Sequence, residues 1–152
     1  MSCYCDDLIA VWQFDGNVSL HCIAFPGGLR VGLEKLAKQD PQIVELAIQF
    51  LEYDLRFFRS GYIKEKSLRR LKHCDFTDGQ RRRIEAMIVR CLDSGGRREF
   101  KGFSRLAVAV YCSSLVEAVA LRQLASDPEV ARRANAVVHV WGSIHLTSRA
   151  SG

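Results

Sequence analysis

The stretch from Asp40 to Arg59, DPQIVELAIQFLEYDLRFFR, decides the fold class of this chain. Asp40 and Pro41 are a favourable helix start, because aspartate caps free backbone amides and proline suits the first turn. Beyond them the polar residues recur every three or four positions and form one stripe, while nearly all the others are apolar. The pattern predicts a central helix over 41–59 that is buried on most sides.

Helical patterns also flank this segment on both sides. Thr77 and Gln80 match a capping box, which predicts the start of another helix. Apolar residues recur at helical spacing through the rest of 29–141. We therefore expect a mainly α protein of about six helices, arranged either as an irregular bundle or as a short stack.

The two ends of the chain have different patterns. Residues 8–14 and 18–25 are rich in β-branched and aromatic residues and flank a turn at 15–17, which predicts an N-terminal β-hairpin over 8–25. Near the other end, 137–146 (VVHVWGSIHL) is compatible with either a helix or a strand. Residues 142–152 are small and polar and are expected to fray. The whole of 1–152 is expected to form one domain.

Length and composition exclude several classes of protein. A chain of 152 residues that is 48% hydrophobic can bury a substantial core, which excludes a disordered chain. No apolar run approaches the roughly 18 residues of a membrane span. The N-terminus lacks the basic and apolar regions of a secretory signal, so we expect a cytoplasmic protein with reduced cysteines.

One sequence pattern occurs twice. Residues 40–47 and 127–134 both fit D-P-[QE]-[IV]-x-x-x-A, which combines an aspartate cap, a first-turn proline, a β-branched residue and a small residue that permits close helix packing. A helix, a short turn with Asp-Pro and a second helix resemble a HEAT-type unit. The resemblance covers about residues 40–141 and implies a stack of helix pairs that binds other proteins.

The net charge of +5 combines two opposed regions. Residues 56–105 hold 15 basic and 6 acidic residues, a net charge of +9, whereas the rest of the chain carries −4. Arginines on helices can hold a nucleic-acid backbone or an acidic partner, although a solvated surface with pairs such as Arg81–Glu85 and Asp78–Arg82 is the simpler alternative. The candidate face comprises Arg69, Arg70, Arg81, Arg82, Arg83, Arg97 and Arg98.

Motifs for metal binding or catalysis are missing from the sequence. Cys3 and Cys5 are closer together than zinc-binding cysteine pairs, so we expect free cysteines and neither a metal nor another cofactor. No nucleophile elbow, P-loop or zinc-protease motif is present. His139 lies in an apolar stretch and is expected in the core or at its boundary.

Asp54 is unusual because helical spacing places it opposite the polar stripe of its segment. A carboxylate in such a place needs a partner, which can be a buried basic residue. The alternative is a polar group at the floor of a pocket, with Tyr53, Tyr62 and Tyr111 as possible hydrogen-bond partners.

Three functional hypotheses follow from the sequence. The leading one is a small cytoplasmic helical module that binds an unidentified protein partner and can form a homodimer, with no contact to a membrane. The second is a nucleic-acid-binding protein that uses the arginine-rich face of 56–105. The third is an enzyme or small-ligand binder with Asp54 in a pocket.

Overall fold

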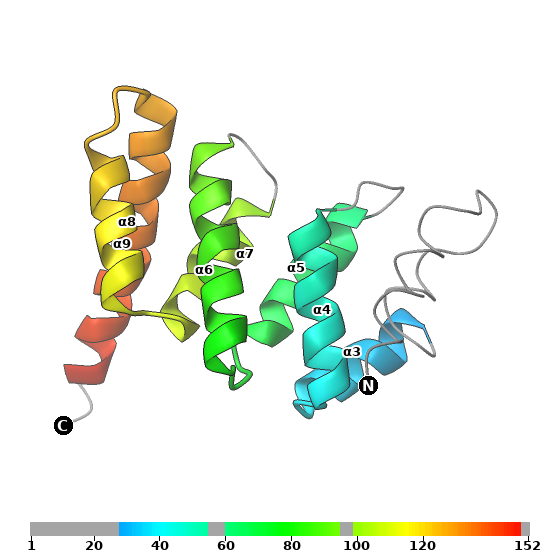
Figure 1. The fold of residues 1–152 in the computed structure, drawn as a ribbon. Coiled ribbons are helices and arrows are strands. Elements are labelled where there is room, and N and C mark those ends of the chain that lie inside the picture. Colours follow the sequence, from blue (N-terminus) through cyan, green and yellow to red (C-terminus); the bar gives the residue numbers. More distant parts are fainter. Residues whose placement is uncertain (1–27, 55–59, 95–98, 150–152) are drawn as a thin grey trace.

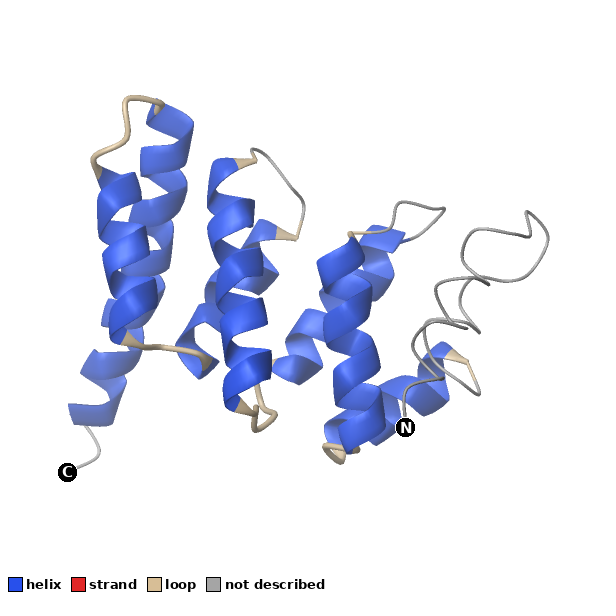
Figure 2. Ribbon diagram, in the orientation of Figure 1, coloured by secondary structure: helices blue, strands red, loops and turns tan. Residues whose placement is uncertain are grey.

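The computed structural model describes residues 28–54, 60–94 and 99–149. These residues form helices joined by short loops, which confirms the expected mainly α fold (Figure 2). The expected hairpin at 8–25 lies outside the described residues. The helices are α3 (Leu29–Ala37), α4 (Pro41–Tyr53), α5 (Ser60–Leu71), α6 (Asp78–Asp93), α7 (Phe100–Ala109), α8 (Ser113–Gln123) and α9 (Pro128–Arg149).

Successive helices alternate between two layers. Helices α4, α6 and α8 contact one another in order and form the first layer, while α3, α5, α7 and α9 form the second. Each of the pairs α4–α5, α6–α7 and α8–α9 also packs within itself, so the pairs stand side by side in a row (Figure 1). The pair α6–α7 therefore has neighbours on both sides.

The expected helix starts are present. The Asp40 side chain accepts hydrogen bonds from the amides of Gln42 and Ile43 at 3.1 and 3.3 Å. Thr77 and Gln80 form the complete capping box at the start of α6. Such caps satisfy amides that have no partner within the helix, and this is why the sequence located the starts well.

Two helix ends differ from expectation. Helix α4 ends at Tyr53 rather than near Arg59, because Asp54 adopts the left-handed conformation with φ 51° and ψ 39°. Aspartate tolerates this conformation better than most residues and can therefore end a helix. At the other end of the chain, 137–146 is helical and α9 continues past the expected end at residue 141 to Arg149.

Helical spacing explains why the 137–146 segment is not a strand. Val130, Ala134, Val137 and Trp141 recur at intervals of four, three and four, and all are buried. A strand would place His139 on the same face as Val137 and Trp141, but His139 is exposed. The Trp141 indole donates a hydrogen bond to the Ala107 carbonyl at 3.3 Å, which ties α9 to α7.

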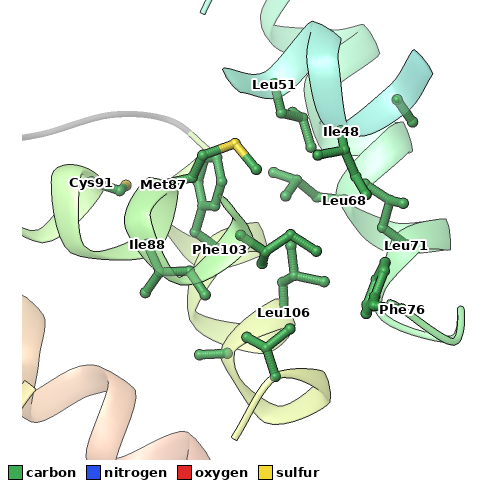
Figure 3. Close-up of a cluster of buried hydrophobic side chains, with 14 of the residues drawn as sticks. Ile48, Leu51, Leu68, Leu71, Phe76, Met87, Ile88, Cys91, Phe103 and Leu106 are labelled. Atoms are coloured by element: carbon green, nitrogen blue, oxygen red, sulfur yellow. The ribbon is translucent and has the colours of Figure 1, made fainter. Parts of the chain in front are cut away.

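Figure 3 shows part of the core, where the pair α4–α5 meets the pair α6–α7. Apolar side chains from the pairs α4–α5 and α6–α7 point toward one another there, and each of those labelled in the figure is at most 8% exposed. Burial of this apolar area is the main force that holds neighbouring pairs together. The labelled residues are Ile48, Leu51, Leu68, Leu71, Phe76, Met87, Ile88, Cys91, Phe103 and Leu106.

Gly102 allows α5 and α7 to approach closely. A Cβ atom at this position would lie 2.7 Å from Cδ1 and 3.1 Å from Cβ of Leu68, closer than packed atoms tolerate. Leu68 is itself 1% exposed, so it has little room to move. The missing side chain of Gly102 therefore sets the spacing between the two helices.

The repeated Asp-Pro pattern does not join equivalent helices. Its first copy starts α4 in the first layer, and its second copy starts α9 in the second layer. The Asp127 carboxylate accepts a hydrogen bond from the Glu129 amide at 2.8 Å, so both copies do act as helix starts. The match thus reflects capping chemistry shared by the two helices.

Candidate anion-binding groove

The surface of the second layer carries two adjoining grooves. The first, of about 210 Å³, lies between α5 and α7. The second, of about 460 Å³, lies between the end of α5, α7 and α9. Lys72 and Arg105 line both, so the two grooves adjoin at these residues, and together they are called here the depression.

The first groove is lined by four basic residues and is called here the four-cation pocket: Arg69, Lys72, Lys101 and Arg105. On α7, Lys101 and Arg105 are four residues apart and share a face, and Arg69 and Lys72 are three apart on the α5 side. Each side thus contributes two cations. Leu68 and Gly102 lie between the basic residues, so the close approach of α5 to α7 brings the two basic rows together.

Most of these cations have no ionic partner within the described residues. Only Arg69 forms a salt bridge, at 3.2 Å to Glu65 one turn earlier, and both side chains are largely exposed. Glu65 is the one acidic residue that lines the pocket. With four basic residues and one acidic residue in its lining, the pocket keeps a net positive charge.

The second groove is called here the apolar groove, because Val108, Ala109 and Val140 contribute to its walls. His73 and His139 also line it, together with Ser143 and the two shared cations. His139 is exposed and lines this groove, contrary to its expected place in the core or at its boundary. The whole depression therefore passes from a basic end to a largely apolar end.

The three consecutive arginines of α6 do not form the face that was expected of them. Arg83 binds Glu45 at 2.6 Å and Glu52 at 2.7 Å, both on α4. Burial tends to raise the pKa of the Glu45 carboxyl, but hydrogen bonds from Arg83 and Gln80 outweigh it and hold the pKa below its usual value. Arg83 thus joins two neighbouring helices of the first layer.

The other two arginines of this run have separate environments. Arg81 donates a hydrogen bond to the Ala109 carbonyl at the end of α7, at 3.1 Å. Arg82 is exposed and has no ion pair in the described part of the chain. The expected pairs Arg81–Glu85 and Asp78–Arg82 do not form, and Glu85 instead accepts hydrogen bonds from Cys112 and Ser114.

The remaining members of the expected face are divided. Arg69 lines the four-cation pocket, and Arg70 is exposed at the last turn of α5. Arg97 and Arg98 lie outside the described residues. Of the five described arginines of that face, Arg69 alone lines the groove.

Asp54 has a basic partner. Its carboxylate lies 2.8 Å from the Lys64 ammonium, whose side chain is 5% exposed, while that of Asp54 is 25% exposed. Neither groove described above is lined by Asp54 or by the three tyrosines. Tyr53, Tyr62 and Tyr111 are about half exposed, and Tyr111 packs edge-on against Trp141 with ring centres 5.2 Å apart.

The described residues contain no group of side chains suited to a metal ion. Cys74 and Cys112 are free thiols, and burial raises the pKa of the Cys74 thiol. Cys3 and Cys5 lie outside the described part. None of the helices over the described ranges combines the length and apolarity that a membrane span requires.

Comparisons with known proteins give no relative. No protein-family model matches this chain, and comparison with curated proteins and with solved structures finds no significant match.

Three pocket residues were absent from the face expected from the sequence, namely Lys72, Lys101 and Arg105. That face was selected by runs of adjacent arginines, but neighbours in a helical sequence point about 100° apart. The spacing of Lys101 and Arg105 was the available signal, since residues four apart share a helical face.

Proposed function

We propose that this protein is a short HEAT-like helical stack that binds an acidic and partly apolar segment of another protein. The alternation of helices between two layers supports the stack. The observation that carries the function is the depression of the second layer, in which the four-cation pocket and the apolar groove share Lys72 and Arg105 as lining residues.

The shape and chemistry of the depression suit an extended or helical peptide. A segment lying across α5, α7 and α9 places acidic side chains against the cations and apolar side chains against Val108 and Val140. Complementary charge accelerates association and selects partners, while burial of apolar surface adds affinity. One ligand that fills the depression would therefore need acidic side chains at the basic end and apolar side chains at the other end.

The nucleic-acid hypothesis has less support. Arg81 and Arg83 hold neighbouring helices, which removes the centre of the proposed arginine face. The lining of the depression contains no phenylalanine, tyrosine or tryptophan on which bases would stack. The four cations could still hold a phosphate backbone, so an oligonucleotide belongs in the test as a competitor.

The enzyme hypothesis draws no support from Asp54. Its ion pair with the buried Lys64 favours a structural role. The free thiols of Cys74 and Cys112 suit a reducing compartment, and we propose the cytoplasm as the location. The homodimer remains an alternative, and its most exposed apolar candidates are Leu121 on α8 and Leu124 directly after it, at 70% and 86% exposure.

A peptide array tests the proposed function. Peptides of about 15 residues would vary independently in acidic and in apolar content. Purified wild-type protein should select peptides that contain both. The double variant Lys72→Glu/Arg105→Glu should bind them at least about tenfold more weakly by fluorescence anisotropy, a change of about 1.4 kcal/mol.

Arg82→Glu is the matched control, because it reverses an exposed cation of the first layer. It should bind the selected peptides within about twofold of wild type. Equal losses in both variants would point to a general charge effect. An oligouridine of about 12 nucleotides that binds while every peptide fails would contradict the proposal.

A further inference from the structure

We infer that the four-cation pocket receives a phosphorylated side chain of the partner segment. This inference rests on the proposed function and names the chemistry of one end of the ligand. The structural basis is the juxtaposition of two cations on α7 with Arg69 of α5 and Lys72 directly after it, around a shared floor.

The arrangement allows one small anion to be approached from several sides. Arg69 and Lys72 belong to the α5 side of the pocket, and Lys101 and Arg105 belong to α7. Because Gly102 has no side chain, α7 comes close to Leu68 and the two basic rows face a common space of about 210 Å³. A group held there is within reach of donors from both helices.

The amount of positive charge favours a phosphoryl group over a carboxylate. The pocket is lined by four cations and by a single acid, Glu65. A carboxylate supplies one negative charge and two oxygens, whereas a phosphate monoester carries about −1.5 to −2 at pH 7 and has three acceptor oxygens. The phosphate therefore matches both the charge and the number of donors more closely.

The existing ion pair does not prevent this binding. The Arg69–Glu65 contact joins exposed side chains one turn apart on the same helix, and such pairs exchange readily for a stronger partner. A guanidinium can bind two phosphate oxygens at once, which Arg69 and Arg105 are both able to do. Lys72 and Lys101 add compact charges and, within the described residues, neither forms an ion pair.

Two small ligands test the pocket directly. The full-length protein would be titrated with phenyl phosphate and, separately, with benzoate, which carries the same ring on a carboxylate. The backbone amide signal of Gly102 in NMR spectra reports on the pocket floor. Phenyl phosphate should shift this signal in a saturable manner and bind at least about tenfold more tightly than benzoate.

Neutral variants assign the effect to the pocket. Lys101→Gln and Arg105→Gln should each weaken phenyl phosphate binding by about tenfold, and Arg82→Gln should leave it within about twofold. Equal binding of the two small ligands, or equal losses in all three variants, would overturn the inference. Thermal unfolding of each variant would show that the fold is retained.

A peptide series separates this inference from the proposed function. One peptide selected on the array would be made with serine, glutamate or phosphoserine at the same position. Phosphoserine should bind about tenfold more tightly than glutamate in wild type, but not in Arg105→Gln. If glutamate and phosphoserine bind equally, the phosphoryl inference fails and the proposed function stands.

Two further outcomes would overturn the inference. If inorganic phosphate binds as tightly as the phosphopeptide, the ligand is the free ion and the inference is overturned. If no peptide binds and an oligouridine displaces phenyl phosphate, both the inference and the proposed function are wrong.

Discussion

Lys72, which follows the last turn of α5, and Arg105, on α7, each line both the four-cation pocket and the apolar groove. Neither residue forms an ion pair within the described part of the chain. Their charges therefore lie where the basic and the apolar ends of the depression meet. Substitutions at these two residues should therefore weaken the binding of every ligand that contacts both grooves.

The spacing of α5 and α7 depends on Gly102. We expect Gly102→Ala to lower the free energy of unfolding by about 1–3 kcal/mol, because the new Cβ would lie 2.7 Å from Leu68 Cδ1. Urea denaturation measures the change. Gly142→Ala is the matched control, since nothing lies within 4 Å of a Cβ at that helical position. The control should be neutral or stabilising by up to about 1 kcal/mol. Similar losses in both variants would contradict this account of Gly102.

The Arg83–Glu45 pair predicts a pH dependence of stability. The folded state lowers the pKa of the Glu45 carboxyl below its usual 4.5, so the stabilisation is fully present above pH 4.5 and is lost as the pH falls through the folded-state pKa. Arg83→Ala should cost about 1 kcal/mol at pH 7, since the pair is only partly buried.

The difference in stability between wild type and Arg83→Ala should shrink as the pH falls below about 4. Urea denaturation across this range checks the trend. Arg132→Ala provides a comparison, because its partner Glu129 is exposed on the first turn of α9 and contacts no other helix through this pair. A constant difference at all pH values would show that Glu45 is not the titrating partner.

The Asp54–Lys64 pair predicts an asymmetric mutational effect. Asp54→Asn retains a residue that tolerates the left-handed conformation but leaves the nearly buried Lys64 ammonium without its charged partner. We expect a loss of about 1–3 kcal/mol in unfolding free energy. The double variant Asp54→Asn/Lys64→Met should recover most of it, because no buried charge remains. A double variant less stable than the single one would show that the ammonium is not the cause.

Arg133 provides a test of a buried cation that holds two helices. Its side chain is 3% exposed and its Nε donates to the Leu92 carbonyl near the end of α6 at 2.7 Å, while Nη1 has no hydrogen-bond partner. Arg133→Ala should cost about 2–4 kcal/mol through the lost packing and the unsatisfied carbonyl.

Arg133→Met retains the length of the side chain and removes the charge. It should cost about half as much as Arg133→Ala, because the packing survives and the incompletely paired guanidinium is gone. Calorimetric melting of both variants separates the two contributions. Equal losses would assign the whole effect to the hydrogen bond with Leu92 rather than to packing.

The starts of the helices could be predicted because they depend on local chemistry. Asp40 with Pro41, and Thr77 with Gln80, satisfy backbone amides within a few residues of themselves. The end of α4 could not be predicted in the same way. The residues after Tyr53 continue an apolar helical pattern, but Asp54 leaves the helix and meets Lys64 from the next helix.

The candidate groove was also hard to predict from the sequence, because it depends on contacts between residues that are distant in the chain. The run Arg81–Arg83 was conspicuous, yet its members point in different directions and two of them bind other helices. The four-cation pocket depends instead on which helices are neighbours. That neighbourhood rests on the contact between Gly102 and Leu68, which are separated by more than thirty positions in the chain.

The pair α8–α9 has a neighbouring pair on one side only within the described residues, whereas α6–α7 has neighbours on both. In a stack of helix pairs, a pair that packs against one neighbouring pair should open at a lower free-energy cost than a pair that packs against two. Amide hydrogens of α9 should thus exchange with solvent sooner than those of α7. His139 and Val140, which line the apolar groove, belong to α9, whereas all four cations lie on the α5 and α7 sides. For a partner segment bound as proposed, contacts with the four cations should therefore last longer than contacts with His139 and Val140.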